Sequence, residues 1–157
     1  MREAIGGTWL FGLVITFIVF FASFLAVSIN YSKAFHVKNN VVDLISKYEG
    51  NNCKARNKIS EYLRTSGALV TGKCPSDYDG YNLAGEKADN GKAYYCVSSD
   101  STDSSTFMSK QFYRVIVFYK IDLPMLGNIA TFKIKGETET IIYPKDDKIS
   151  NEGCRWM

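Results

Sequence analysis

The sequence predicts an α+β fold in which one long N-terminal helix packs on a small antiparallel β-sheet. Three observations support this: a charge-free apolar run at the N-terminus, an amphipathic continuation of that run, and alternating apolar residues towards the C-terminus. With 46% hydrophobic residues, 22% charged residues and 3 Pro in 157 residues, the composition is typical of an ordered chain. We expect an N-terminal tail with an apolar helix, an amphipathic extension of that helix, and a head domain, over residues 1–32, 33–50 and 51–157.

The apolar helix is long enough to cross a membrane. No Asp, Glu, Lys or Arg occurs between Ala4 and Ser32, and Thr8 to Ile29 forms its apolar centre. At 1.5 Å per residue this centre spans the roughly 30 Å of a bilayer's hydrocarbon core. A cleaved secretory signal is the main alternative, because Ala26-Val27-Ser28 resembles a peptidase site. A buried core helix is a second alternative. The transmembrane interpretation is favoured because the run is long and its helical periodicity continues past that site.

Small or polar residues repeat at every fourth position along this apolar helix. Such spacing lets two helix backbones approach closely, and hydroxyl or amide groups then bond across the contact. The alternative is that these residues reflect only the ordinary composition of a spanning helix. The residues predicted to pack against a partner helix are Thr8, Gly12, Thr16, Ala22, Ala26 and Asn30.

Beyond the apolar run, hydrophobic residues recur at spacings of three and four until Gly50-Asn51-Asn52 provides a stop. The sequence therefore predicts one helix of about 45 residues, half in lipid and half covering the head. The residues predicted to join this stem to the sheet are Ala34, Val37, Val41, Leu44, Ile45 and Tyr48.

The first part of the head combines a short helix with irregular segments. Lys54–Ser66 has one apolar helical face, and Gly67 ends it. The Gly-, Asp- and Asn-rich stretch from Thr71 to Gly91 predicts an exposed, irregular segment. A first strand is expected at Lys92–Ser98, followed by a mobile polar loop over Ser98–Ser105.

The second part of the head predicts a hairpin. Phe112–Ile121 alternates so that one face is wholly apolar, Asp122–Asn128 interrupts it, and Ile129–Tyr143 returns. Gly136 indicates a bulge or a close approach. An antiparallel sheet of about three strands must bury its apolar face, and the amphipathic helix is the expected cover. The inner positions predicted for the return strand are Ala130, Phe132, Ile134, Thr138, Thr140 and Ile142.

Four cysteines without a C-x-x-C pair predict structural disulfides in an oxidising compartment. Three pairings are possible, and we favour Cys74 with Cys96 and Cys53 with Cys154. Reduced thiols in the cytosol are the alternative. Lysines just after the span would place the head inside, but long domains translocate largely regardless of flanking charge. We therefore expect a single-pass cell-membrane protein with a cytoplasmic N-terminus and an extracytoplasmic head.

The order of a half-apolar helix, a short helix and a cysteine-stapled sheet resembles type IV pilins and pseudopilins. More narrowly, INYSKAFHVKNNVVDLISKYEG and FYRVIVFYKIDLPMLGNIATFKIKGETETI resemble minor pilin-like proteins of bacterial tight-adherence (Tad) pilus systems. The resemblance implies a pilin-like fold and a structural role at the membrane or in a surface pilus. It also implies other pilin subunits and assembly platform proteins as partners. The chain departs from the family pattern after Gly6-Gly7, because no acidic residue follows within the span and Glu3 precedes the glycines.

Motifs for catalysis or cofactor binding are incomplete. Gly67–Cys74 matches G-x-x-x-x-G-K, but Cys74 replaces the hydroxyl residue that holds magnesium. His36 is the only histidine, and a net charge of +3 without clustering does not predict nucleic-acid binding. We expect no enzyme activity, no cofactor, no metal and no small-molecule substrate. The aspartates whose spacing matches no calcium loop are Asp77, Asp79, Asp89, Asp100 and Asp103.

A non-polymerising, singly anchored domain that binds a ligand or partner outside the cytoplasm is the alternative function. A membrane-tethered enzyme is a third class, which requires an unrecognised site between Thr71 and Gly91.

Overall fold

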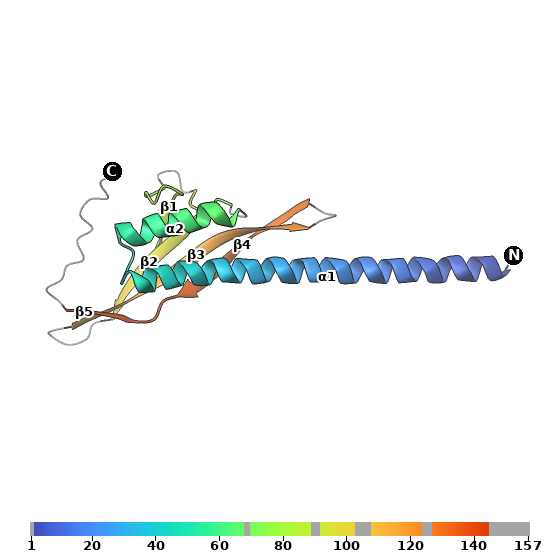
Figure 1. Cartoon of the computed structure of the whole chain (residues 1–157), viewed down its shortest axis with the longest axis horizontal. Helices are drawn as coiled ribbons and strands as arrows, with labels where there is room; N and C mark the ends of the chain where they lie inside the picture. Colours follow the sequence, from blue (N-terminus) through green and yellow to red (C-terminus); the bar gives the residue numbers. More distant parts are fainter. Residues whose placement is uncertain (1, 68–69, 89–91, 103–107, 124–126, 145–157) are drawn as a thin grey trace.

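The structure, a computed structural model, describes residues 2–67, 70–88, 92–102, 108–123 and 127–144. Figure 1 shows a rod-like helix whose C-terminal half lies along a twisted sheet, whereas its N-terminal half extends away from the rest of the chain. The predicted α+β fold is confirmed. The elements are α1 (Arg2–Lys47), α2 (Cys53–Ser66), β1 (Asp79–Tyr81), β2 (Tyr95–Thr102), β3 (Met108–Leu123), β4 (Gly127–Glu137) and β5 (Ile141–Pro144).

Helix α1 is continuous over 46 residues, which corresponds to about 69 Å at the standard rise. Its end has a local cause. Glu49 and Gly50 have positive φ angles of 54° and 137°, and the Gly50 N–H donates to the Ile45 carbonyl over 2.9 Å. This left-handed turn closes the last helical carbonyls, so the predicted stop is confirmed.

Helix α2 begins and ends with side-chain and glycine caps. The Asn52 side chain accepts a 2.9 Å hydrogen bond from the Ala55 N–H at the N-terminus, and Gly67 adopts a φ of 68° at the C-terminus. One apolar face, which includes Ile59 and Leu63, is buried. The second helix predicted at Lys54–Ser66 is therefore present and begins one residue earlier.

The sheet is antiparallel throughout and is built around β3, in the order β1-β2-β3-β4, with β5 also paired to β3. Val97 lies opposite Val115, and Val117 lies opposite Ile134, so these apolar residues share the face that is turned to α1. The long strand β3 thus provides pairing positions for three other strands, which makes it the centre of the head.

Two expectations for the middle of the chain were wrong. The polar tract expected as a loop is strand as far as Thr102, because each residue from Tyr95 to Thr102 pairs with β3. The segment expected to be irregular contains β1, whose Gly80 pairs with Cys96. The residues from 103 to 105 of the predicted loop lie outside the described residues.

The return strand is divided into β4 and β5, and this division inverts the expected faces. Glu137 pairs with Arg114 and Ile141 pairs with Gln111, so one extra residue lies between the two pairings and reverses the alternation. Ile141, rather than Ile142, consequently packs on the core, and Ile142 is 55% exposed. Among the other predicted inner positions, Ile134 and Thr138 lie inward, Thr140 and Phe132 are exposed, and the side chain of Ala130 is not described.

Gly136 is a point of close approach rather than a bulge. It pairs in register with Val115, and a Cβ at this position would lie 2.7 Å from Lys38 Cδ and 3.0 Å from Val42 Cγ2 on α1. The register shift of this hairpin lies instead between Ile121 and Asp122. The absence of a side chain at Gly136 therefore allows α1 to cross directly over β4.

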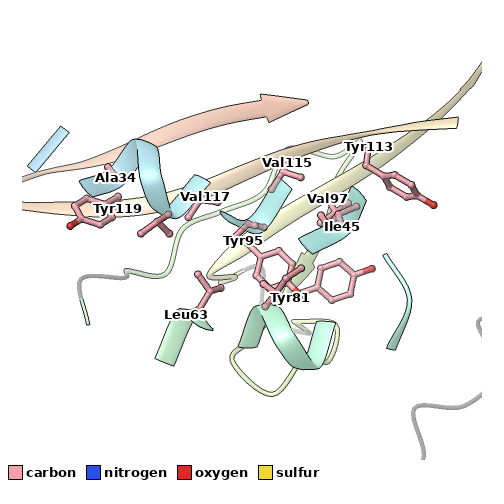
Figure 2. Close-up of a cluster of buried hydrophobic side chains, with 13 residues drawn as sticks. Ala34, Ile45, Leu63, Tyr81, Tyr95, Val97, Tyr113, Val115, Val117 and Tyr119 are labelled. Atoms are coloured by element: carbon pink, nitrogen blue, oxygen red, sulfur yellow. The ribbon is translucent and has the colours of Figure 1, made fainter. Parts of the chain in front are cut away.

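Apolar side chains are buried on both faces of the sheet. Figure 2 shows the larger cluster, in which residues of α1 and α2 meet the inner face of β2 and β3. Ile116 and Phe118 on the opposite face form a second cluster with Cys96 and Ala93. This second cluster was not predicted, because the alternation in the sequence indicates only one wholly apolar face.

Tyr95 is a buried core residue whose hydroxyl has no hydrogen-bond partner among the described residues. Its ring stacks on Tyr81 with centroids 5.3 Å apart. Burial raises the pKa of Tyr95 well above its usual range. The folded state therefore disfavours the tyrosinate, whereas the unfolded chain ionises freely near pH 10.

We predict that Tyr95→Phe stabilises the full chain in detergent micelles by about 1 kcal/mol at pH 7, because it removes an unsatisfied buried hydroxyl. Because Tyr95 stays neutral in the folded state, its ionisation does not affect the free energy of unfolding below about pH 10. Above that pH the unfolded chain ionises first, and the free energy of unfolding falls by up to about 1.4 kcal/mol per pH unit. Urea unfolding followed by near-UV circular dichroism at pH 7 and pH 11 should show a smaller alkaline loss for Tyr95→Phe. Tyr31→Phe, at a 63% exposed position, is the control. Destabilisation of Tyr95→Phe at pH 7 would contradict the prediction.

Candidate functional site

The N-terminal half of α1 exposes large apolar side chains. Trp9, Phe20 and Phe24 are 75%, 67% and 62% exposed, and among the residues whose burial is described none in this half of the helix belongs to the buried core. The helix over Gly7–Lys47 is long and apolar enough to be one candidate membrane span. It lies near the N-terminus, as predicted, and the orientation of the head across the membrane stays a prediction.

Polar side chains in this half bond to the helix itself. Thr16 Oγ1 donates to the Gly12 carbonyl over 2.9 Å, and Asn30 Nδ2 donates to the Ala26 carbonyl over 3.0 Å. Ser23 and Ser28 make the same contact to the carbonyls four residues before them. Since a lipid environment offers these groups no water, such internal bonds make the surface compatible with a bilayer.

The first group of predicted helix-packing residues lines a shallow groove on α1. The groove follows the helix surface where Gly12 leaves a gap between larger neighbours, and its lining comprises Thr8, Trp9, Gly12, Leu13, Thr16, Phe17 and Phe20. A Cβ on Gly12 would meet no atom within 4 Å. Glycine within a helix lowers the stability of the helix by about 1 kcal/mol relative to alanine. Contacts among the described residues do not explain why position 12 is glycine rather than alanine.

The two groups of predicted packing residues share one helix face. At 100° per residue, Ala26 projects in the same direction as Thr8, and Asn30 in the same direction as Gly12. This direction also matches that of Val37 and Val41, which the sheet covers. The face that packs on the sheet in the head thus continues into the candidate span, where Ala22 is exposed.

The predicted stem-to-sheet contact is largely present. Ala34, Val37, Val41 and Ile45 are buried in the larger cluster, and Leu44 packs against it while partly exposed. Tyr48 differs, because α1 ends at Lys47 and Tyr48 lies in the following turn, half-buried and outside that cluster. The helix end explains the difference, since the 3.6-residue period no longer applies there.

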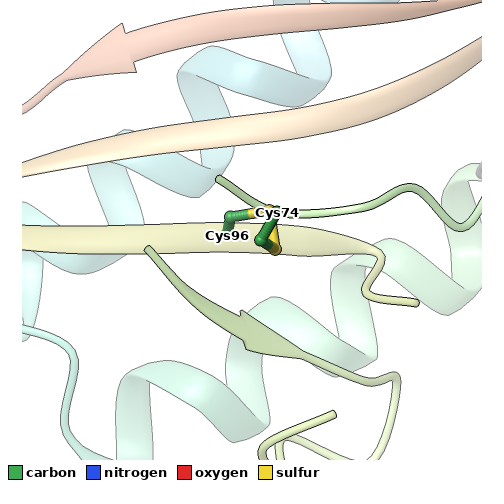
Figure 3. The surroundings of a disulfide bond; sticks show 2 residues. All are labelled: Cys74 and Cys96. Carbon is green, nitrogen blue, oxygen red and sulfur yellow. A yellow bond between two sulfur atoms is a disulfide. The ribbon is translucent and has the colours of Figure 1, made fainter. Parts of the chain in front are cut away.

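The disulfide between Cys74 and Cys96 is present, and the two cysteines are 22 positions apart in the sequence. Figure 3 shows that it attaches the segment before β1 to strand β2. Cys96 is fully buried beside Ile116 and Phe118, and Cys74, Tyr78 and Ala88 pack on this cluster. The disulfide therefore covers the sheet face opposite α1. Cys53 is not free, but Cys154 lies outside the described residues, so their pairing stays a prediction.

Two aspartates of the head form local ion pairs. Asp79 pairs with Lys87 over 3.0 Å, and Asp100 pairs with Arg114. No group of three or more His, Cys, Asp or Glu that could hold a metal ion occurs within the described ranges. Asp89 and Asp103 lie outside these ranges, and His36 is exposed on α1. The described part of the head thus assembles no set of metal ligands.

A polar groove between α2 and the turn after β1 was missed by the sequence analysis. It is lined by Asn57, Ser60, Glu61, Arg64, Thr65, Leu83, Ala84 and Glu86. Ser60 Oγ donates to the Arg56 carbonyl over 2.6 Å, and Glu61 accepts from Lys58 over 2.8 Å. The residues that line the groove include no histidine, and Glu61 is paired with Lys58, so the groove offers a polar contact surface. The residues that form it are far apart in sequence, so no local motif marks them.

Comparisons with known proteins give no match: no family model, no curated protein and no solved structure matches the chain. The functional argument therefore depends on the residues and contacts described above.

Proposed function

We propose that this chain is a membrane-anchored, minor pilin-like or pseudopilin-like structural component of a Tad-type assembly or secretion system. The observation that carries the proposal is the division of α1. Its N-terminal half is apolar and exposed, whereas Ala34, Val37 and Ile45 in its other half are built into the head's core. One continuous helix therefore joins the candidate membrane span to the head.

Such a helix suits a subunit that is stored in a membrane and then packs among other helices. A continuous helix transmits the position of its apolar half to the head, because no flexible linker lies between the two. Gly12 and Thr16 allow a neighbouring helix to approach closely, and small residues of this kind are enriched where membrane helices pack. The head, fixed to the other half, then presents its surface outside the bundle.

The disulfide supports an extracytoplasmic head in this proposal. Structural disulfides persist in oxidising compartments and are rare in the cytosol, and Cys74 and Cys96 are joined. The N-terminus is then cytoplasmic, and the proposed partners are the membrane, other pilin or pseudopilin subunits and assembly platform proteins.

The second candidate is an anchored extracytoplasmic domain that binds a partner without polymerising. One observation favours it: no acidic residue follows Gly6-Gly7 within the apolar run. In pilins such a residue pairs with the N-terminus of a neighbouring subunit, so its absence removes one contact expected of a fibre.

Replacing Gly12 with leucine is expected to separate the two candidates. In cells that carry the assembly machinery, Gly12→Leu should insert in the membrane normally but show about tenfold lower recovery with other pilus components. A leucine in the groove blocks the close approach of a second helix, and a loss of 1.4 kcal/mol corresponds to a factor of about ten in affinity.

The matched control is Ser28→Leu, which also introduces leucine at a small, exposed position but projects from the opposite side of α1. Ser28→Leu should retain recovery. Replacement of residues 8–29 by an unrelated spanning helix should abolish incorporation of an assembly subunit and leave a simple anchored domain intact. Unchanged recovery of Gly12→Leu and of this replacement would overturn the proposal.

A further inference from the structure

The β3–β4 hairpin extends beyond the rest of the head, towards the candidate membrane span. Figure 1 shows the paired ends of β3 and β4 running along α1 in the direction of its N-terminus, past α2 and the other strands. The two strands are paired up to Leu123 and Gly127. This end of the hairpin lies on the same side of the molecule as the apolar half of α1.

The reach of the hairpin follows from its contact with α1. Gly136 approaches Lys38 and Val42, so it is level with about residue 40 of the helix. From Gly136 back to Gly127 the strand covers nine residues, or about 30 Å at 3.3 Å per residue. From residue 40 to Ile29, the end of the predicted span, the helix covers only about 16 Å. Even a strand inclined by about 45° to α1 would therefore bring the hairpin end to the depth of Ile29.

Exposed aromatic side chains occur at the level where the membrane surface would lie. Phe132 is four residues from Gly136 on β4, hence level with about residues 31–34 of α1. Phe132, Tyr31 and Phe35 are 47%, 63% and 45% exposed. Aromatic side chains are favoured in the interfacial layer of a bilayer, because it accommodates both an apolar ring and polar neighbours.

The two paired strands also carry basic residues near Phe132. Lys120 lies opposite Thr131, and Lys133 lies opposite Phe118. Asp122 is the one acidic residue in the stretches 118–123 and 127–133. Exposed aromatic side chains beside lysines are the chemistry that a lipid surface with anionic headgroups accepts.

We propose that the part of β3 and β4 that extends past the rest of the head, on which Phe132 lies, is a second membrane contact, which enters the lipid interface beside α1. The proposal depends on α1 spanning the bilayer, and it does not require the chain to polymerise. Two separate contacts would fix the tilt and rotation of the head relative to the membrane plane, which a single helix alone does not.

Tryptophan quenching in nanodiscs that hold one full-length chain tests this proposal. Single tryptophans are introduced in a Trp9→Phe, Trp156→Phe background, as Leu123→Trp at the strand end, Phe132→Trp at the aromatic level, and Ile142→Trp as the control. Ile142 is 55% exposed, comparable to Phe132, but lies near the other end of β3. Lipids brominated along their acyl chains should quench Leu123→Trp most, Phe132→Trp less, and Ile142→Trp not at all.

Two outcomes would overturn the proposal. If Leu123→Trp and Phe132→Trp are quenched no more than Ile142→Trp, or only when several chains share one nanodisc, the hairpin end contacts water or another chain rather than lipid. A Trp156→Phe chain that keeps Trp9 reports separately on the span. Quenching at Trp9 without quenching at the hairpin would refute the second contact alone, whereas no quenching at either would also refute anchoring by α1. Phe132→Trp keeps the test valid if Leu123→Trp fails to fold.

Discussion

Shortening Ile45 to alanine is expected to lower the free energy of unfolding of the head by about 2–5 kcal/mol. Ile45 is 0% exposed and lies in the cluster where α1 meets the sheet and α2. Its removal leaves a cavity and also takes apolar contacts away from β2 and β3. Urea unfolding of the full chain in micelles, followed by near-UV circular dichroism, would measure the loss.

The matched control lies on the same helix. Phe24→Ala also truncates a large apolar side chain, but Phe24 is 62% exposed and belongs to the candidate span. We expect this variant to leave the unfolding of the head unchanged, because the exposed Phe24 side chain is not part of the head's core. Equal losses for the two variants would contradict the division of α1 into an anchoring half and a structural half.

Residues with a strong periodic pattern allowed the elements around the core to be predicted. Val37, Val41 and Ile45 recur at helical spacing because one face of α1 is buried, and Tyr113, Val115 and Val117 alternate because one face of β3 is buried. Gly67 marked the end of α2 because its positive φ suits glycine. In each case the signal is local, so the sequence alone was sufficient.

Elements stabilised by distant partners were missed. Ser98 to Thr102 has the composition of a loop, yet it is a strand because β3 is long enough to pair with it. Strand β1 lies in a segment rich in glycine and aspartate, where the disulfide and the Gly72–Ala93 bridge provide order from outside the segment. Local composition does not contain this information.

The features of the candidate site likewise differ in whether the sequence alone predicts them. The apolar half of α1 and the stem residues follow from periodicity, whereas the reach of the hairpin depends on how far β4 extends past its contact with Lys38 and Val42. The inversion between β4 and β5 moved Ile142 outward through one extra residue. A one-residue change in register moves every later side chain to the opposite face of the sheet. The hydrophobic pattern of the return strand does not predict this change.

Removing the disulfide by Cys74→Ala and Cys96→Ala together is expected to lower the free energy of unfolding of the head by about 3 kcal/mol. The chain-entropy argument gives this value for a closed loop of about this length, since the cross-link restricts the unfolded chain. Cys96 is fully buried, so alanine is preferred to serine, which would add an unsatisfied hydroxyl to the core. The same urea series in micelles would measure the change.

The disulfide also determines whether the outer face of the sheet is covered. Cys74, Tyr78 and Ala88 pack over Ile116 and Phe118. Without the bond, the Gly72–Ala93 bridge, the pairing of β1 and the buried Tyr81 ring still join this segment to the head, but no covalent link does so near Cys74. Limited proteolysis of the double variant should therefore cut first within residues 70–88, while α1 stays intact. Ala88→Gly, a control that trims the same cluster but keeps the bond, should retain protection. If the double variant were as stable and as protected as the parent chain, the bridges would order this segment and the disulfide would have no structural role.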